Sequence, residues 1–397
     1  MRADFAIVNA RVMTCDPARP GLGIVERGAI AIAGGRIARV DEGSAPDADE
    51  VIDAHGALVT PGLVDCHTHA VFAGDRAHEF ELRAGGASYV EIQAAGGGIA
   101  ATLGPTRAAI ADGSIGRLLI DRVARMQREG TTAIEVKTGY ALTTDGELGL
   151  LAAIEAARGQ VRARLVPTLL AHLIPPERAR DRDAFVREIV EQWIPRAHTA
   201  TSVDVWCEST AFTLAETRAI YAAARAHGKA IRGHVGQLSD LGAAELLGEF
   251  GARSADHVEQ ISAAGIAALA HAGTVAVMLP GACVQLRLPV PPVAALRAAG
   301  VPLAIATDLN PGSSWCESLP IQMWLATTHF QMTVDEAWLG VTRHAARALG
   351  FAPHEAGALV AGAPADLVLW TTDRPADVAY RYGSSQIARV FAAGLTL

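Results

Sequence analysis

Eight short runs of apolar and β-branched residues recur along the middle of the 397-residue chain, and helical stretches follow them. The runs are Leu63–His69, Thr131–Thr138, Leu165–His172, Val203–Glu208, Ala230–Val235, Ser254–Val258, Val275–Leu279 and Pro302–Asp308. Amphipathic segments that follow such runs include Asp181–Ala197, Leu214–His227 and Asp240–Phe250. Strands that alternate with helices form parallel sheets, and eight such units predict an α/β fold of the (β/α)8 TIM-barrel type.

The two ends of the chain have a different pattern, in which short strand-like segments are separated by Gly, Asp and Pro. These segments are Ala6–Val12, Ala29–Ala33, Arg36–Val40 and Ala57–Thr60 at one end, and Gly357–Leu359, Asp366–Trp370 and Ile387–Ala392 at the other. Such patterns are typical of strands joined by turns. We therefore expect residues 1–60 and 355–397 to pair into one small β domain beside a barrel formed by residues 61–354.

Composition and charge exclude several classes of partner. The formal net charge is −8, the pI is near 5.9, and no basic cluster is present, which argues against nucleic acid and anionic membranes. The five cysteines form no CxxC pair, so we expect reduced thiols and a cytoplasmic protein. The apolar run at the N-terminus is too short for a signal peptide or a membrane anchor. The size of the chain suggests a homodimer.

Active sites of barrels of this type gather at the carboxyl ends of the strands. Five of the thirteen histidines lie at that position. In chain order the strand ends carry His67 and His69, Lys137 and Tyr140, His172, Glu208, His234, His257, Pro280 and Asp308. This concentration predicts a functional site at the mouth of the barrel.

The histidines and one carboxylate at these strand ends suit a metal ion. Residues i and i+2 of a strand point to the same side, so His67 and His69 share one face. With His234 and Asp308 they give three imidazoles and a carboxylate, which suit a first-row metal and leave one position for water. A metal lowers the pKa of such a water and polarises a carbonyl. We expect Asp308 to accept the proton of the water and His257 to hold or relay it.

Other interpretations of the same residues remain open. His172 and His257 could be hydrogen-bonded core histidines, and Asp308 could form an Asx turn. Cys66 points away from its histidine neighbours in strand alternation, which favours packing. Lys137 could be a structural ion-pair partner, and Glu208 is its expected mate.

The glycine-rich stretch Ala94–Thr106 lacks the strand–turn–helix context of a phosphate-binding loop, so a flexible loop over the mouth is the preferred interpretation. The remaining histidines that we interpret as surface or packing residues are His78, His227, His271, His329 and His344.

Several motifs resemble those of a known group of enzymes. PGLVDCHTH at Pro61–His69 resembles the first-strand signature of the metal-dependent amidohydrolases. KTGY, AHLIPPE and TDLNPGSS, which begin at Lys137, Ala171 and Thr307, make the chain similar to the imidazolonepropionases within that superfamily. The resemblance implies a distorted barrel with a small β-sandwich-like domain built from both chain ends. It also implies hydrolysis of the ring amide of 4-imidazolone-5-propanoate to N-formimidoyl-L-glutamate in histidine degradation, by a metal-activated water.

The resemblance also implies roles for individual residues. One Zn²⁺ or Fe³⁺ per chain would be bound by His67, His69, His234 and Asp308. The small anionic substrate would be bound by Arg76, Tyr140, His172, Gln237, Asn310, Gly312 and Ser313. A guanidinium just past the first strand suits a bidentate pair with the propionate carboxylate, in agreement with the role of Arg76.

Two residues distinguish this chain from other members of the superfamily. HVGQ at His234–Gln237 stands where the family often has His-Ala-Asp-Glu. An amide cannot shuttle protons as the glutamate of deaminases does, but it can hydrogen-bond the edge of an imidazolone, so Gln237 argues against a deaminase. Two-metal members bridge their ions with a carbamylated lysine from a strand near the middle of the barrel. Lys137 lies on the second predicted strand, which predicts a single metal.

Other functions would fit parts of the pattern. Another cyclic amidohydrolase, or a purine or pyrimidine aminohydrolase, would keep the metal site without needing Arg76, and an aminohydrolase would release ammonia. A non-catalytic barrel scaffold would not need the four predicted ligands. A metal-storage module would not explain the Arg, Tyr and Gln around the site.

Overall fold

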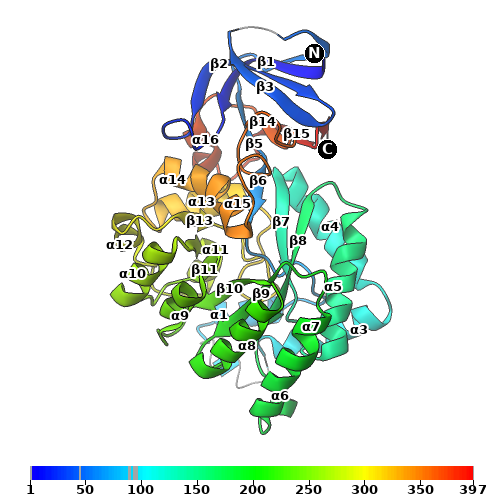
Figure 1. The fold of residues 1–397 in the computed structure, drawn as a ribbon, viewed down its shortest axis with the longest axis vertical. Coiled ribbons are helices and arrows are strands. Elements are labelled where there is room, and N and C mark those ends of the chain that lie inside the picture. Colours follow the sequence, from blue (N-terminus) through cyan, green and yellow to red (C-terminus); the bar gives the residue numbers. More distant parts are fainter. Residues whose placement is uncertain (1, 44–45, 88–90, 93–96, 397) are drawn as a thin grey trace.

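The computed structural model describes residues 2–43, 46–87, 91–92 and 97–396, and it contains two separate sheets. The larger body is a barrel surrounded by helices, and a smaller sheet that holds both chain ends lies beside it (Figure 1). The predicted combination of a barrel with a terminal β-sheet unit is therefore confirmed. The residue boundaries predicted between the two units stay a prediction.

Within the described residues, eight parallel strands form the barrel sheet, and they pair in chain order from β6 to β13. Their bounds are β6 Leu63–Asp65, β7 Thr131–Lys137, β8 Arg164–Ala171, β9 Ser202–Cys207, β10 Ala230–Val235, β11 Ser254–His257, β12 Val275–Met278 and β13 Leu303–Ile305. Each lies within one residue of a predicted run or inside it. These strands are almost completely buried, as strands of a parallel sheet covered on both faces must be.

The barrel closes through the segments that follow its first and last strands. The backbone N–H of Asp308 donates to the carbonyl of His67 at 3.0 Å, and the N–H of His69 donates to the carbonyl of Leu309 at 2.9 Å. Thr68 and Leu309 form a parallel bridge between the same two segments. We call this junction the seam. It brings three of the predicted metal ligands together by backbone hydrogen bonding alone.

Helices cover the outside of the barrel (Figure 1). Up to residue 226 they are α1 Ala77–Ala84, α3 Ala100–Ala111, α4 Ile115–Arg128, α5 Thr144–Arg158, α6 Arg182–Glu188, α7 Ile194–Arg196 and α8 Leu214–Ala226, with a 3₁₀ turn at Pro176–Arg178 and a π-helical turn at Ile189–Trp193. After residue 226 they are α9 Ala243–Phe250, α10 Ala263–Ala272, α11 Pro280–Leu286, α12 Val293–Ala298, α13 Leu319–Thr328, α14 Val334–Gly340, α15 Arg343–Leu349 and α16 Pro375–Tyr380.

Local sequence fixes where several of these helices begin. Thr213 and Thr333 each form a capping box with a glutamate three residues later, at the starts of α8 and α14. Such caps satisfy backbone N–H groups that have no partner within the helix. The three helical segments predicted from amphipathic patterns are confirmed. No described helix is long and apolar enough to cross a membrane.

The smaller sheet joins strands from both ends of the chain in the order β16-β15-β14-β5-β1-β2-β3, and β4 pairs with β1. The strands are β1 Ala3–Met13, β2 Ile24–Ala33, β3 Arg36–Glu42, β4 Ala48–Asp53, β5 Leu58–Pro61, β14 Leu367–Trp370, β15 Ile387–Ala392 and β16 Leu395–Thr396. β5, which leads directly into the barrel, lies between β1 and β14. This sheet therefore needs both chain ends to form.

Three features of the terminal regions and the glycine-rich segment differ from the predictions. The strand predicted at Gly357–Leu359 is wrong, because Gly357 has φ +77° and lies in a bend of the chain. β4 was not predicted, because its sequence ADEVID is acidic and mostly exposed. The loop predicted at Ala94–Thr106 is wrong from Ala100 onward, where α3 begins, and residues 94–96 lie outside the described part of the chain.

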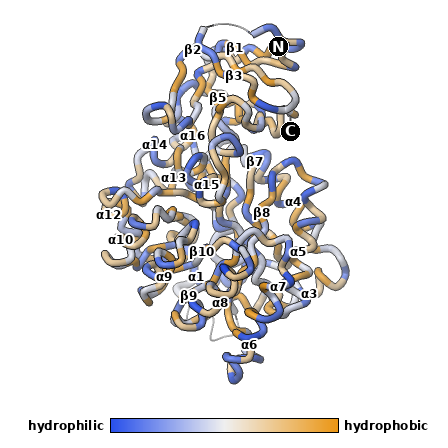
Figure 2. Tube along the Cα trace, viewed as in Figure 1, coloured by the Kyte–Doolittle hydropathy of each residue, from blue (hydrophilic) through white to orange (hydrophobic). Residues whose placement is uncertain are grey.

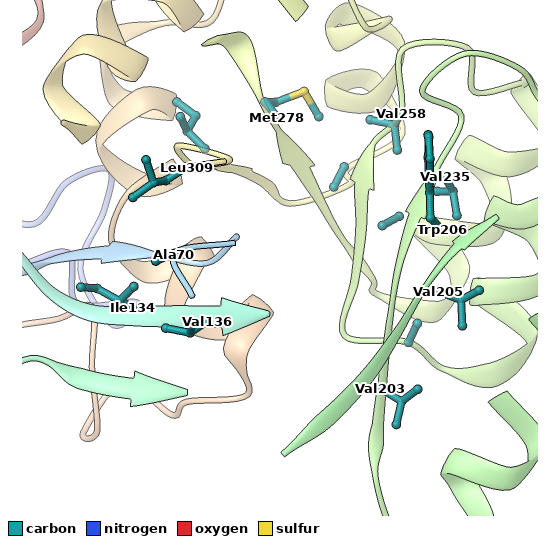
Figure 3. Close-up of a cluster of buried hydrophobic side chains, with 14 of the residues drawn as sticks. Ala70, Ile134, Val136, Val203, Val205, Trp206, Val235, Val258, Met278 and Leu309 are labelled. Carbon is teal, nitrogen blue, oxygen red and sulfur yellow. The ribbon is translucent and has the colours of Figure 1, made fainter. Parts of the chain in front are cut away.

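The barrel core is built from side chains that alternate along the strands. Ile134 and Val136 of β7, Val203 and Val205 of β9 and Met278 of β12 are all buried and contribute to one cluster (Figure 3). The end of the molecule near α6 is hydrophilic and lies far from the small sheet (Figure 2). The core lies between strands and helices and leaves the ends of the strands free for polar residues.

Candidate active site

The predicted site residues converge on one cavity at the carboxyl ends of the barrel strands. His234 lies in β10 and His257 ends β11, whereas the others follow their strands in loops. The predicted residues that line the cavity are His69, Arg76, Tyr140, His172, His234, Gln237, His257, Asp308, Asn310 and Ser313. His67 is fully buried next to His69 and His234, and Gly312 lies against Arg76 at the cavity edge. The structure thus brings all the predicted site residues together.

His67, His69 and His234 form a group whose nitrogen atoms are close enough to hold one metal ion. The Nε2 atoms of His69 and His234 are 3.3 Å apart, and Oδ1 of Asp308 lies 3.4 Å from Nε2 of both His67 and His69. Tetrahedral zinc with bonds of about 2.0–2.1 Å places its ligand atoms roughly 3.3 Å from one another. The spacing of this ligand cluster, defined as His67, His69, His234 and Asp308, therefore fits a metal.

The hydrogen bonds of two imidazoles direct their other nitrogens toward the cluster. Nδ1 of His67 lies 2.7 Å from Asp256, and Nδ1 of His234 lies 2.9 Å from Asp204. A carboxylate behind a histidine fixes its tautomer and ring orientation in metal sites. Within the described residues, Nε2 of His67 and Nδ1 of His69 are buried without a hydrogen-bond partner. Nε2 of His67 lies beside the Asp308 carboxylate and is free of other hydrogen bonds among these residues, so it fits the role of a metal ligand.

The charge around the cluster favours a cation. Burial and the charge of Lys137 lower the pKa of His67, but Asp256 and Asp308 outweigh them and raise it to about 9. Burial alone would raise the pKa of Asp308, yet His67 and His69 hold it well below its usual value. Burial lowers the pKa of His234 to about 3, so this imidazole is neutral and can act as a ligand. The carboxylates of Asp256 and Asp308 therefore stabilise positive charge at His67, whereas His234 stays neutral.

Asp308 itself does not make the Asx turn that was considered for it. The turn after β13 belongs to Asn310, whose Oδ1 accepts from the N–H groups of Gly312 and Ser313 at 2.8 and 2.7 Å. The Asn310 amide also donates to the carbonyl of Asp308. This loop has φ +50° at Asp308, a conformation that non-glycine residues seldom adopt. The carboxylate of Asp308 is consequently turned toward the histidines.

Below the ligand cluster lies a buried charge network that sequence reasoning missed in part. Nζ of Lys137 donates to Asp204 at 2.7 Å and to Glu135 at 2.9 Å, and lies 3.5 Å from Asp256. Nε of Arg232 lies 3.0 Å from Glu135. All five side chains are buried. Asp204 and Asp256 therefore connect Lys137 directly to His234 and His67, two histidines of the ligand cluster.

The ion pair predicted between Lys137 and Glu208 is wrong. Glu208 accepts hydrogen bonds from Ser209, Leu238 and Ser239, in the loop that follows β10. Its carboxylate turns outward to that loop, whereas Lys137 points into the barrel. The sequence does carry a signal for this network. Glu135 precedes Lys137 by two positions and Arg232 precedes His234 by two positions, so each pair lies on one face of its strand.

Arg76 occupies the rim of the cavity and is held there by a residue that was not predicted. Nε and Nη2 of Arg76 lie 2.9 and 2.8 Å from Oε2 of Glu79, one turn along α1. Oε1 of Glu79 accepts from the N–H of Gly98 at 2.8 Å. The Nη1 side packs on Gly312, where a Cβ would lie only 2.0 Å from it. The guanidinium is thus fixed edge-on to the cavity.

Aromatic side chains form the opposite wall. The rings of His69 and His172 stack with centroids 5.2 Å apart, and Tyr140 packs edge-on against both. Nδ1 of His172 donates to the carbonyl of Gly139 at 3.1 Å, which leaves Nε2 as an acceptor. Burial lowers the pKa of His172 well below its usual value, so the ring is neutral. His172 is therefore a cavity-lining histidine and not one enclosed in the core.

Cys66 and Gln237 lie where strand alternation and loop position suggested. Cys66 is fully buried in an apolar cluster that includes Val64 and Ala133. Gln237 lines the cavity two residues beyond β10. Lys137 lies on the second barrel strand, as expected.

Comparisons with known proteins agree with this geometry. Residues 58–397 match the model of the amidohydrolase family. An imidazolonepropionase of Caulobacter vibrioides is 48% identical over 98% of this chain and 99% of its own length. An imidazolonepropionase of Xanthomonas oryzae is 47% identical over 98% of each chain.

A solved structure shows the same fold at much lower identity. The structure of 5-methylcytosine deaminase from Klebsiella pneumoniae superposes with a TM-score of 0.76 and 17% identity, covering 99% of this chain and 97% of that one. The cavity geometry, the family match and the full-length relatives lead to one conclusion. This chain belongs to the amidohydrolase family and, within it, to the imidazolonepropionases.

Proposed function

We propose that this protein hydrolyses the ring amide of 4-imidazolone-5-propanoate to N-formimidoyl-L-glutamate, a step of histidine degradation. The observation that carries the proposal is that one cavity presents both the ligand cluster and the guanidinium of Arg76. A cyclic amide needs an activated water, and a propionate side chain needs a cation. The relatives that share almost the whole length of the chain are named for this activity.

We propose that His67, His69, His234 and Asp308 bind one Zn²⁺ or Fe³⁺ per chain. When bound, the metal would lower the pKa of a water and polarise the ring carbonyl. A single ion is favoured because the carboxylates of Asp204 and Glu135 outweigh the effect of burial and raise the pKa of Lys137. A lysine must lose its proton to become a bridging carbamate, and this one is held as an ammonium by three carboxylates.

The protein side chains would move the protons. Asp308 is ionised at neutral pH, as the direction of its pKa shift requires, and can accept the proton of the attacking water. His257 lines the same cavity and would carry a proton to the ring nitrogen as that nitrogen leaves. Both steps use groups already positioned by the barrel strands.

The remaining side chains would bind and orient the substrate. Nη1 of Arg76 would bind the propionate carboxylate, because Glu79 already occupies the other edge of the guanidinium. Gln237 can both donate to and accept from the flat amide edge of the ring. Tyr140 and His172 form an aromatic wall against which the ring can pack. Asn310, Gly312 and Ser313 shape the loop beside the carboxylate.

Metal removal tests the function and the metal requirement together. We expect the purified protein to remove the ultraviolet absorbance of fresh imidazolonepropanoate well above the spontaneous rate, and chelation to abolish this activity. Added Zn²⁺ or iron should restore it, and the melting temperature should rise with metal because only the folded state has the site. Retention of activity in protein shown to be metal-free would contradict the proposed chemistry. Release of ammonia from a purine or pyrimidine instead would favour an aminohydrolase.

Substitution of Arg76 tests the carboxylate site. Arg76→Met should raise KM by roughly 10- to 100-fold, the loss expected for a charge-assisted hydrogen bond, with a smaller effect on kcat. Gly312→Ala should change KM in the same direction, because its Cβ must displace the guanidinium. Gly116→Ala, on α4, is the matched control, because a Cβ there meets nothing within 4 Å. An unchanged KM in Arg76→Met would remove this residue from substrate binding.

We also propose that the enzyme acts in the cytoplasm. All five cysteines are free, and four of them are buried, which is compatible with a reducing compartment. The homodimer expected from the size of the chain stays a prediction.

A further inference from the structure

Glu259 is a buried carboxylate without a hydrogen-bond partner, two residues beyond the end of β11. Its side chain has 0% exposure, and neither of its oxygens makes a hydrogen bond within the described residues. Burying an unpaired carboxylate costs several kcal/mol, so folded proteins seldom retain one without a use. The activity described above gives Glu259 no role.

The titratable group that faces this carboxylate is His257. Nδ1 of His257 lies 3.6 Å from Oε1 of Glu259, and this nitrogen also has no hydrogen-bond partner among the described residues. The second neighbour is Cys283 of α11, whose thiol is directed to the carbonyls of Leu288 and Pro289. Burial, and then the charge of Glu259, raise the pKa of Cys283 to about 12, so it stays neutral. The His257 ring is therefore the polar group that faces the Glu259 carboxylate.

The backbone at His257 and Val258 has positive φ angles, and this conformation sets the positions of the His257 and Glu259 side chains. His257 has φ +82° and Val258 has φ +62°, although neither is glycine and Val258 is β-branched. Such conformations cost of order 1–3 kcal/mol each and persist only where the surroundings enforce them. Hydrogen bonds from Val258 to Val235 at 3.0 Å and from Gln260 to Gly236 at 2.7 Å do so here. The turn directs the His257 ring into the cavity and places Glu259 behind it.

We propose that Glu259 is a positioning residue that orients the His257 ring through Nδ1 while His257 carries a proton in the reaction. The inference rests on the proposed function, because it assumes that His257 is the proton carrier. A gap of 3.6 Å is too long for a hydrogen bond in the resting protein. Catalytic pairs often shorten only when the reacting complex forms. The arrangement resembles that of enzymes in which a buried aspartate lies behind a catalytic histidine. In those enzymes the aspartate fixes the tautomer and the position of the histidine ring.

The proposal separates stability from activity. Because Glu259 accepts no hydrogen bond from any described residue, Glu259→Gln should leave the melting temperature unchanged or raise it. The same substitution should lower kcat by about 10²-fold, within the range found for proton-transfer groups, with KM little changed. Glu147 is the matched structural control, because its buried carboxylate accepts from the N–H groups of Gly139, Ala141 and Leu142. Glu147→Gln should lower the melting temperature.

A double-mutant cycle between Glu259 and His257 provides the test. The four proteins are the wild type, Glu259→Gln, His257→Asn and the double variant, each with its bound metal measured. If Glu259 acts only through His257, Glu259→Gln causes no further loss of kcat in the His257→Asn background. Losses that multiply, or a loss of bound metal in Glu259→Gln, would overturn the inference.

The wild-type protein separates this inference from the function on which it rests. If it fails to turn over imidazolonepropanoate with metal bound, the proposed function falls, and this role of Glu259 falls with it. If the wild type is active and Glu259→Gln keeps its kcat, only the role of Glu259 is overturned.

Discussion

Asp308→Ala is expected to lower kcat for imidazolonepropanoate by at least about 10³- to 10⁴-fold, because one substitution removes the side chain that we propose both as a metal ligand and as the proton acceptor. Oδ1 of Asp308 lies 3.4 Å from Nε2 of both His67 and His69, so no other carboxylate oxygen in the cavity lining is placed to replace it. The decay of the ring absorbance gives kcat. The amount of metal bound per chain is measured on the same sample. It shows whether a low kcat comes from loss of the metal ion or from loss of the proton acceptor.

Two further variants sharpen this measurement. Asp308→Asn keeps the shape and a ligand oxygen but cannot accept a proton, so it should retain more metal than Asp308→Ala and remain nearly inactive. Asp121→Asn, on the exposed face of α4, changes the same charge far from the cavity and should keep the wild-type rate. Near-normal turnover in Asp308→Ala would exclude Asp308 from the mechanism.

The largest effect on stability is expected for Lys137→Met. The ammonium of Lys137 neutralises Asp204, Glu135 and Asp256, all of them buried, and its removal leaves those carboxylates with Arg232 as their remaining counter-charge in the network. Breaking a buried ion pair from one side costs about 3–5 kcal/mol. For a chain of this length the melting temperature should fall by about 5 °C. Thermal unfolding followed by circular dichroism measures the shift.

A companion variant shows whether uncompensated charge is the cause. In Lys137→Met/Glu135→Gln one negative charge is removed with the positive one, while the partners of His67 and His234 are kept. This double variant should be more stable than the sum of the two single effects predicts. Strict additivity of the two losses would mean that packing of the lysine side chain, and not its charge, stabilises the barrel.

The barrel strands were predictable from sequence for a clear physical reason. A strand buried on both faces favours apolar and β-branched residues. β8 is almost continuously apolar, whereas β7, β9 and β10 keep apolar residues at alternate positions and carry charged residues between them. Because parallel strands end at the same edge, residues at these ends could be expected to meet. His67, His234 and Asp308 do meet, although they come from distant parts of the sequence.

The sequence did not show which ion pairs form, because these depend on the direction of each side chain. It also did not show where α3 begins, because glycines and helix-forming alanines lie next to each other there. Lys137 and Glu208 both end strands, yet one side chain points into the barrel and the other toward a loop. In α3 the helix-forming alanines that begin at Ala100 outweigh the preceding glycines, and Thr106 fixes the helix through a hydrogen bond with Ala73. Glu79 and Glu259 are ordinary charged residues in sequence, and only their burial gives them significance.

The seam between the first and last barrel strands affects when the site can form during synthesis of the chain. Its backbone hydrogen bonds join residues next to the first barrel strand to residues next to the last, and the small sheet likewise needs β5 beside β14. A nascent chain on the ribosome therefore exposes both His67 and His69 long before Asp308 has been synthesised. Contacts this distant in sequence form late in folding. The complete ligand set arises only in the finished chain, so synthesis itself delays the appearance of hydrolytic activity.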